Sequence, residues 1–235
     1  MEKKVEEQNT EHISFISKSE QFIEKNKNLL IIIVVAIVVV VLGYFGIKKF
    51  VSEPRRAKAN VEIFPAEQYF AFAAEAQGEG NYRMALYGDS TSNDKFAIGL
   101  LAVIDKYGST PAGNRAKYEA GICFLHLGQY QEALKYLNDY KGKDQMTPIL
   151  DEMMKGDVEA EQEHYDAAVK HYNKAAKMDN NPITAPFALF KAGLCYLKTN
   201  DKAKAAECFK QVKDNYPESS LVAQMDAFIT VSESK

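Results

Sequence analysis

The stretch AGICFLHLGQYQEALKYL, residues 120–137, decides the fold, because the chain repeats its pattern as AGLCYLKTNDKAKAAECF at residues 192–209. The second stretch begins 72 positions after the first, and equivalent positions keep the same kind of residue. Glycine stands at 121 and 193, cysteine at 123 and 195, leucine at 125 and 197, and alanine at 133 and 205. An echo at a fixed spacing is typical of proteins built from stacked structural repeats.

A third copy of the pattern lies between these two. From each of three glycines, an alanine follows after 12 positions and a large side chain after 16. The three sets are Gly121, Ala133 and Leu137; Gly156, Ala168 and Tyr172; and Gly193, Ala205 and Phe209. Two antiparallel helices approach closely where one presents a small residue, and a bulky residue on the partner then fills the space. The spacing therefore predicts three helical hairpins with close internal packing.

The flanking sequence predicts one degenerate unit before these hairpins and a capping helix after them. The second helix of the degenerate unit is expected within residues 93–111, NDKFAIGLLAVIDKYGSTP, and its first helix at 65–77, PAEQYFAFAAEAQ. Between them, residues 78–94 are rich in Gly, Ser, Asn and Asp and are expected to form a loop, either an Ω-loop with a function or a simple insertion. After Pro217, ESSLVAQMDAFITVSE is expected to be the helix that closes the array.

The run LLIIIVVAIVVVVLGYFGI, Leu29–Ile47, contains no charged residue. As a helix it is roughly 28 Å long, close to the thickness of a bilayer's hydrocarbon core. It is rich in β-branched residues, but a lone strand in lipid would leave its backbone groups unpaired, so a helix is expected. No small-residue cleavage pattern follows the run, and 28 residues precede it. The sequence therefore predicts a retained single-pass membrane anchor rather than a cleaved signal peptide.

The orientation of this anchor is left open by its flanking charges. Its N-terminal side carries three nearby lysines, and its C-terminal side carries five lysines and arginines. They are Lys18, Lys25 and Lys27 on one side, and Lys48, Lys49, Arg55, Arg56 and Lys58 on the other. The positive-inside rule alone favours a cytoplasmic C-terminal domain, although long domains can cross the membrane despite such a bias.

Two shorter segments flank the anchor. Before it, Ile13, Ile16 and Ile23 have near-helical spacing, so residues 1–28 are interpreted either as a tail with an amphipathic helix or as an extension of the membrane helix. After it, Pro54 and Pro65 predict a kinked juxtamembrane helix.

The three units resemble the tetratricopeptide repeat, a helix–turn–helix unit of about 34 residues. The resemblance includes the aromatic residues Phe124 and Tyr196, the segments GQY at 128–130 and EHY at 163–165, and the closing prolines Pro182 and Pro217. Glu159 and Lys202 depart from the pattern, at positions where the family has aromatic residues. Together with the anchor predicted at residues 29–47, the resemblance implies an all-α fold, in which a single transmembrane helix is followed by an α-α superhelix of about three full repeats, one degenerate repeat and a cap helix.

The expected organisation has four parts: an N-terminal tail (1–28), a transmembrane helix (29–47), a juxtamembrane helix with an irregular first repeat (48–92) and the repeat domain (93–235). In the tetratricopeptide family the first helices of successive units line a concave face that binds other proteins. Carried onto this sequence, that face comprises Arg115, Tyr118, Ile122, Leu125, Leu150, Met153, Asp157, Phe187, Phe190, Leu194 and Leu197. Such a surface suits an apolar helix or an extended segment of a partner. The alternative is that these residues are the core of a short, closed superhelix.

Several other functions find no support in the sequence. It contains no Gly-rich phosphate loop, no HExxH and no GxSxG, so no catalytic, cofactor-binding or metal-binding residues are expected. His164 and His171, near Glu161 and Glu163, are interpreted as a solvated polar face rather than a metal site. The net charge is −3 and no block of Lys and Arg is present, so no nucleic-acid partner is expected. Cys123, Cys195 and Cys208 are expected to be small core residues, with a disulfide between Cys195 and Cys208 left open.

The layout as a whole resembles the membrane-anchored tetratricopeptide proteins of Bacteroidetes-type envelopes. It is more distantly similar to the YfgM-type ancillary subunits of the Sec translocon, which work with a membrane-anchored periplasmic chaperone of the prolyl-isomerase type. These resemblances imply an inner-membrane adaptor with periplasmic repeats. Its expected partners are translocon subunits, such a chaperone or exported polypeptides, and residues 29–47 contact the lipid bilayer. The alternative is a cytoplasm-facing scaffold for a regulatory or cell-division complex.

Overall fold

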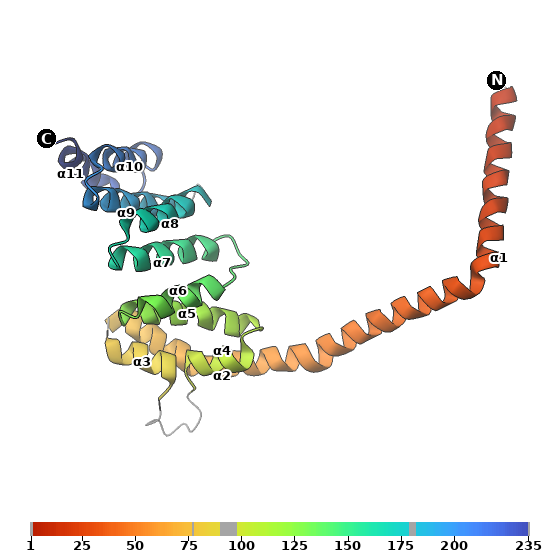
Figure 1. Cartoon of the computed structure of the whole chain (residues 1–235), viewed down its shortest axis with the longest axis horizontal. Coiled ribbons are helices and arrows are strands. Elements are labelled where there is room, and N and C mark those ends of the chain that lie inside the picture. Colours follow the sequence, from red (N-terminus) through yellow and green to blue (C-terminus); the bar gives the residue numbers. More distant parts are fainter. Residues whose placement is uncertain (1, 77, 90–97, 179–181, 235) are drawn as a thin grey trace. The chain divides into compact units, whose positions relative to one another are not determined.

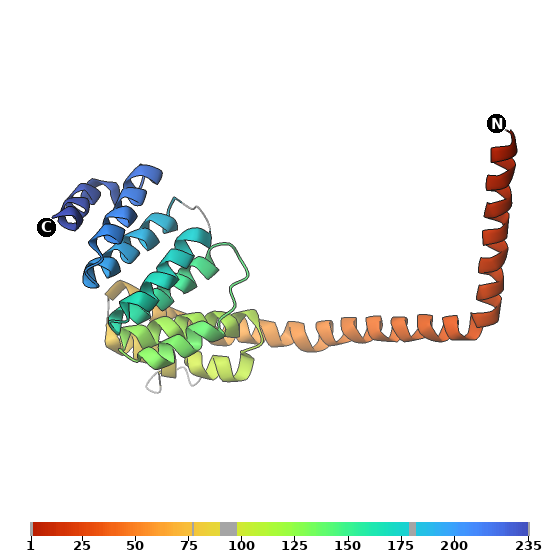
Figure 2. The same cartoon turned by 45° about the horizontal axis from the view of Figure 1, so that its top comes forward.

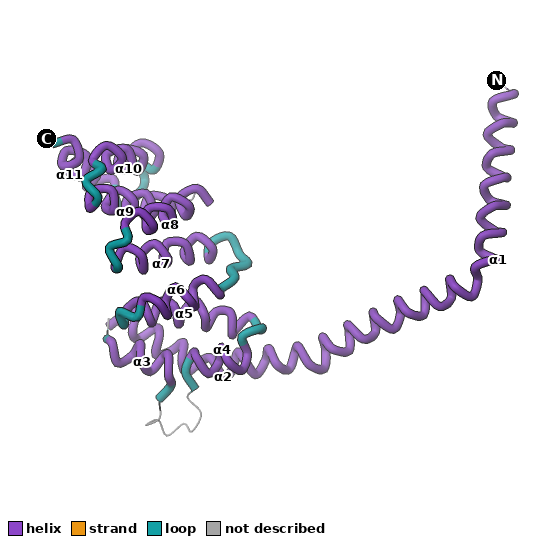
Figure 3. Tube along the Cα trace, in the orientation of Figure 1, coloured by secondary structure: helices purple, strands orange, loops and turns teal. Residues whose placement is uncertain are grey.

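The computed structural model describes residues 2–76, 78–89, 98–178 and 182–234 (Figures 1 and 3). Every named element in this part of the chain is helical, apart from one isolated bridge between Gly88 and Ile98. The chain divides into two compact units, residues 1–55 and 56–235. The expectation of an all-α fold is confirmed for the described residues.

The first unit is built on α1 (Glu2–Ile47) and a short π-helix, η1 (Lys48–Ser52). α1 bends between its N-terminal part and the rest of the helix (Figure 2). The large apolar side chains of residues 29–47 are exposed apart from Leu30, which is half-buried. In the described residues one continuous helical stretch, Phe22–Glu75, is long and apolar enough to cross a membrane. The side chains of residues 1–21 lie outside the described part, so the amphipathic face at Ile13 and Ile16 stays a prediction.

The second unit begins within α2 and continues as a row of antiparallel helices (Figure 2). Their bounds are α2 (Glu53–Ala76), α3 (Glu79–Tyr87), α4 (Leu100–Tyr107), α5 (Pro111–His126), α6 (Tyr130–Asp139), α7 (Thr147–Glu161), α8 (Tyr165–Met178), α9 (Thr184–Lys198), α10 (Lys202–Asn215) and α11 (Val222–Glu233). The pairs α5/α6, α7/α8 and α9/α10 are the three expected hairpins, and α11 packs on α10 as the expected cap.

The glycines of the repeated pattern are the points of closest approach within each hairpin. A Cβ atom added to Gly121 would lie 2.6 Å from Leu137 Cγ. At Gly156 it would lie 2.5 Å from Tyr172 Cε1, and at Gly193 it would lie 2.5 Å from Phe209 Cε1. A side chain at any of these positions would force the facing residue to move, so the predicted pairing of a small residue with a large one 16 positions later is confirmed in all three units.

The expected loop at residues 78–94 was wrong, because Glu79–Tyr87 form α3. Tyr82, Ala85 and Leu86 are buried, and their spacing of three and four residues fits one face of a helix. α3 contacts both α4 and α5, as α5 contacts α6 and α7, so α3 and not residues 65–77 is the first helix of the degenerate unit. The second helix, α4, begins at Leu100, and residues 90–97 lie outside the described part.

Residues 65–77 instead belong almost entirely to the longer helix α2, which runs through Pro65. α2 packs Ala59, Ile63 and Ala66 into the same core as the first repeat. Glu62 of α2 accepts hydrogen bonds from Lys106 Nζ at 2.8 Å and from the Tyr107 hydroxyl at 2.7 Å, both on α4. η1 ends two residues before Pro54, and the Glu53 N–H donates to the Lys48 carbonyl five residues earlier.

Glu119 on α5 is a buried carboxyl close to the charged side chains of Glu67 and Arg115. Within the described part of the chain, its Oε2 atom is buried without a hydrogen-bond partner. Burial, with a smaller contribution from the negative charge of Glu67, raises the pKa of Glu119 to about 8, and the positive charge of Arg115 opposes the rise. The folded protein therefore holds this proton across neutral pH, where the unfolded chain releases it.

Folding stability is expected to fall as pH rises from 4.5 to about 8, because in this range the folded state binds a proton that the unfolded state has lost. Glu119→Gln should flatten this slope and stabilise the protein by roughly 1–3 kcal/mol at the alkaline end. Chemical denaturation at a series of pH values measures the effect. Glu132→Gln, at an exposed position of α6, is the control that should keep the wild-type slope. A Glu119→Gln protein with an unchanged slope would contradict the assignment.

Candidate protein-binding groove

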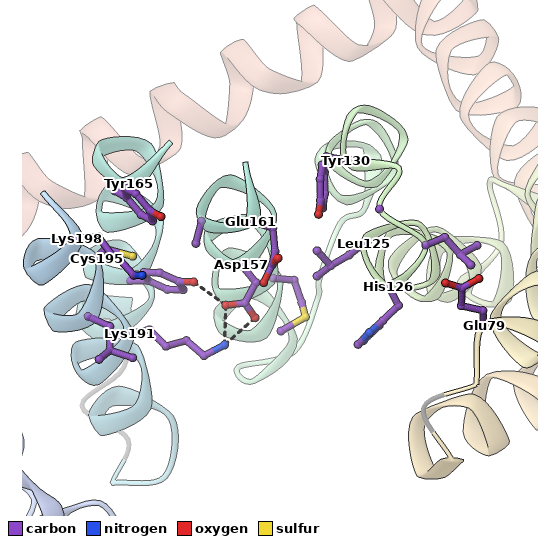
Figure 4. Close-up of a pocket in the computed structure, with 16 residues that line it drawn as sticks. Glu79, Leu125, His126, Tyr130, Asp157, Glu161, Tyr165, Lys191, Cys195 and Lys198 are labelled. Atoms are coloured by element: carbon purple, nitrogen blue, oxygen red, sulfur yellow. Dashed lines mark hydrogen bonds and ion pairs between the residues drawn. The ribbon is translucent and has the colours of Figure 1, made fainter. Parts of the chain in front are cut away.

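An open groove of about 770 Å³ crosses the C-terminal halves of the first helices of successive repeats (Figure 4). α5, α7 and α9 contribute most of its lining, α6 and α8 contribute tyrosines, and α3 contributes Glu79. The lining residues are Glu79, Leu125, His126, Leu127, Gly128, Tyr130, Met154, Asp157, Ala160, Glu161, Tyr165, Tyr172, Lys191, Leu194, Cys195 and Lys198. The groove therefore runs across the repeats rather than inside one of them.

A polar cluster lies in the groove wall between α7, α8 and α9 (Figure 4). The Tyr172 hydroxyl donates to Asp157 Oδ1 at 2.6 Å, and Lys191 Nζ lies 2.6 Å and 2.7 Å from the two carboxylate oxygens. Burial and the charge of Asp157 raise the pKa of Tyr172, which keeps its proton and donates it. The Asp157 carboxylate on α7 thus links three helices, because Tyr172 lies on α8 and Lys191 lies on α9.

Apolar side chains line the groove on both sides of this cluster. Leu125, Met154 and Leu194 come from three successive first helices and are half-buried, and Tyr130 adds an aromatic wall from the start of α6. These groups keep some exposure and are regularly spaced along the array, so they can contact successive side chains of a bound chain.

Charges at the rim are mixed in sign. Glu79 and Glu161 are acidic, and Lys198 is basic. His126 stacks on Tyr82 with ring centroids 4.5 Å apart, and burial lowers its pKa, which favours the neutral ring at neutral pH. The groove therefore presents no strong field of one sign and does not select for a highly charged ligand.

Two of the eight predicted binding residues, Leu125 and Asp157, line this groove, together with Leu194 from the wider predicted face. The other six lie elsewhere on the first helices. Arg115 is exposed and bonds Glu67 of α2 at 3.0 Å, and Tyr118 packs its ring against Tyr140 at 5.2 Å.

The remaining predicted residues lie on α5, α7 and α9 but do not line the groove. Met153 is only 7% exposed and packs in a core cluster with Ile149, Ala175 and Ala188. The Phe190 ring contacts Phe209 and Phe228 at 5.9 Å and 5.0 Å, so the capping helix covers it. Leu150 is half-buried, and Phe187 is 38% exposed outside the groove. Ile122 and Leu197 are half-buried too.

Sequence reasoning missed the groove residues Tyr130, Met154, Tyr172 and Lys191. Tyr172 had a visible signal, because the repeated pattern places it opposite Gly156, but the pattern depends on side-chain size and carries no information about the hydroxyl. Lys191 stands 34 positions after Asp157, one repeat further on, and that spacing is the signal that could have paired them.

A second set of charges, also missed, is buried on α7. Lys155 Nζ lies 2.7 Å from Asp151 Oδ2, and Glu152 accepts from Lys174 at 2.8 Å and pairs with His171 Nδ1 at 2.9 Å. His164 pairs with Glu159 at 3.0 Å. Both histidines are thus held by single carboxylates, and among the described residues no group of three or more His, Cys, Asp or Glu side chains is arranged to hold a metal.

The three cysteines are buried free thiols, so the disulfide left open between Cys195 and Cys208 is not formed. Burial raises the pKa of both thiols to about 11, which keeps them protonated and unreactive at neutral pH. The expectation that the cysteines are core residues is confirmed.

Comparison with known proteins agrees with this architecture. Three models of the tetratricopeptide repeat match residues 97–145, 153–182 and 187–219, which span α4–α6, most of α7 with α8, and most of α9 with α10. A TPR repeat-containing protein of Methanocaldococcus jannaschii is 28% identical over 124 residues, or 53% of this chain. The match covers 21% of that relative's length. Three segments of the chain therefore match the tetratricopeptide repeat, one at each of the three hairpins.

Proposed function

We propose that the protein is a membrane-anchored, non-catalytic adaptor whose groove binds a segment of another polypeptide. The observation that carries this proposal is the groove of about 770 Å³ that crosses three successive repeats and combines apolar walls with the fixed Asp157–Lys191 pair. A volume of this size holds several side chains, and its open ends let a chain pass through.

The chemistry of the lining favours an extended or helical segment with apolar side chains. Leu125, Met154 and Leu194 offer contacts for such side chains along the groove. Asp157 and Lys191 offer an acceptor and a donor that can bond the backbone of a bound chain. Because these two groups neutralise one another, the site favours apolar segments over acidic tails.

The adaptor is proposed to sit in a bacterial inner membrane, with residues 29–47 as the anchor and the repeats in the periplasm. The exposed apolar helix supports the anchor, and the layout shared with envelope tetratricopeptide proteins supports the periplasmic side. The proposed partners are translocon subunits, a membrane-anchored chaperone of the prolyl-isomerase type or polypeptides emerging during export. A cytoplasm-facing scaffold is the second candidate, favoured by the greater number of lysines and arginines after the apolar run.

Protease treatment of spheroplasts distinguishes the two locations. Digestion of residues 56–235 by added protease, with the N-terminal tail protected, is expected for the periplasmic arrangement. Protection of the repeats until the membrane is lysed would overturn it and support the cytoplasmic scaffold.

Groove binding is tested with a photo-crosslinking amino acid at position 130, where Tyr130 lines the groove. In intact envelopes this variant is expected to form adducts with specific proteins. Adding Leu194→Asp should lower the adduct yield by roughly tenfold, because it places a charge in an apolar contact surface. The matched control is Val231→Asp, which alters an exposed apolar side chain on α11 outside the groove.

Helix content and the unfolding midpoint of both aspartate variants show whether the array stays folded. Equal adduct yields in the Leu194→Asp and Val231→Asp proteins would contradict binding in the groove. Mass spectrometry of the adducts tests the partner class separately, because recovery of only unrelated envelope proteins would argue against a role in export and leave groove binding standing.

A further inference from the structure

One face of helix α2 is buried against the repeats, and the opposite face is exposed. Ala59, Ala66 and Ala73 recur at seven-residue intervals and are 0%, 1% and 0% exposed, because they pack into the core of the repeats. In a seven-residue helical pattern, positions of one kind lie along one line of the helix. The alanines therefore define the line of α2 that faces the repeats.

The opposite line of α2 carries a regular exposed pattern, which we call the α2 seam. Its members alternate by three and four positions and are all exposed: Ala57, Val61, Phe64, Gln68, Ala71 and Glu75. Val61 is 74% exposed and Phe64 is 58% exposed, and Phe72 beside the seam is 55% exposed. If the three buried alanines occupy position f of a heptad, the seam residues occupy positions a and d, which a coiled coil buries between its helices.

We propose that the α2 seam pairs with the α2 seam of a second copy of this chain in a parallel two-stranded coiled coil. The seam is narrow, with two residues per heptad, which matches the contact made by one partner helix. Ala57 and Ala71 are small and allow close approach, while Val61 and Phe64 supply the apolar contact. The width of the α2 seam therefore suits contact with one partner helix and not with a broad docking surface.

Two polar features favour an identical partner. Gln68 stands at an a position inside the seam, where its amide can both donate to and accept from the same amide of the other copy, and a polar residue at such a position fixes register and partner number. Glu75, the other polar residue at an a position, lies one residue before the end of α2. Glu53 and Lys58 are five positions apart at the flanking g and e positions of α2. In a parallel pair each Glu53 meets Lys58 of the other copy, so the flanking charges are complementary.

Site-directed disulfide formation tests the seam directly, using the full chain in detergent micelles. Val61→Cys is expected to give covalent dimers on mild oxidation, because a positions of the two helices face each other. Arg56→Cys is the matched control: it is also exposed on α2, but its heptad position c points away from the seam. Wild-type protein reports the background from the three buried native cysteines.

A second measurement does not depend on disulfide chemistry. Phe64→Glu introduces like charges into the seam and is expected to weaken dimerisation by roughly tenfold or more, measured by sedimentation of the full chain over a range of concentrations. Val231→Glu, at an exposed apolar position on α11, should leave the association unchanged. Both side chains are exposed, so circular dichroism is expected to show unaltered helix content.

Three outcomes would overturn the proposal. They are equal cross-linking at positions 61 and 56, a wild-type protein that is monomeric at all concentrations, and a Phe64→Glu protein that associates as tightly as wild type. A seam covered by lipid or by another part of the same chain would produce the second result. The groove adducts formed from position 130 are a separate readout, so failure of the dimer leaves the proposed binding function untouched.

Discussion

Phe209→Ala is expected to lower the free energy of unfolding by roughly 3–5 kcal/mol, because it removes a fully buried ring and leaves a cavity. Phe209 is 0% exposed and lies where α9, α10 and α11 meet. Its ring contacts Phe190 at 5.9 Å and Phe228 at 5.1 Å, and its edge faces Gly193. Chemical denaturation of the full chain in detergent, followed by circular dichroism, measures the loss.

Phe187→Ala is the matched control, since it truncates the same kind of side chain on α9 at a position that is 38% exposed. It is expected to cost less than about 1 kcal/mol. A Phe209→Ala protein as stable as the Phe187→Ala protein would mean that the C-terminal hairpin does not depend on this aromatic cluster.

Gly156→Ala is expected to destabilise the protein by roughly 1–3 kcal/mol, through crowding rather than through a cavity. The added Cβ atom would lie 2.5 Å from Tyr172 Cε1, and Tyr172 is buried and bonded through its hydroxyl to Asp157. The ring cannot move away without breaking that bond, so the groove should be disturbed together with the hairpin. Denaturation midpoints and adduct yield from position 130 are the two measurements.

Gly80→Ala tests whether the effect comes from packing. Gly80 is also helical, in α3, but no neighbouring atom lies within 4 Å of the added Cβ. Alanine is the better helix former by about 1 kcal/mol, so this variant is expected to be as stable as wild type or slightly more stable. Similar losses at both glycines would refute the role of Gly156 as a close-approach position.

The sequence was sufficient for the repeated hairpins because their packing depends on residue size at fixed spacing. Gly121, Gly156 and Gly193 each lie against the large residue that the pattern pairs with them. α3 was missed because glycines at 78 and 80 and the polar run after residue 88 suggested a loop. The buried face of α3 spans only three side chains, too few for a clear periodic signal before its partners are known.

The candidate site was predicted only in part, for a geometric reason. Repeat register identifies which face of a first helix lies toward the concave side, but it does not say which end of that helix stays open. Leu125 and Asp157 lie at the open end, whereas Met153 is buried beneath α8 and α9 and Phe190 is covered by Phe228 of the capping helix. Such covering depends on contacts between repeats, which residue size alone does not reveal.

The helices of the second unit make their contacts mainly with the next elements along the chain. Few contacts therefore join residues that are far apart in the sequence, and such a low contact order favours rapid folding. During synthesis each hairpin can close as soon as its own residues have left the ribosome, beginning at α3 and ending at α10. Phe209 would then keep part of its contact with water until α11 arrives to shield it.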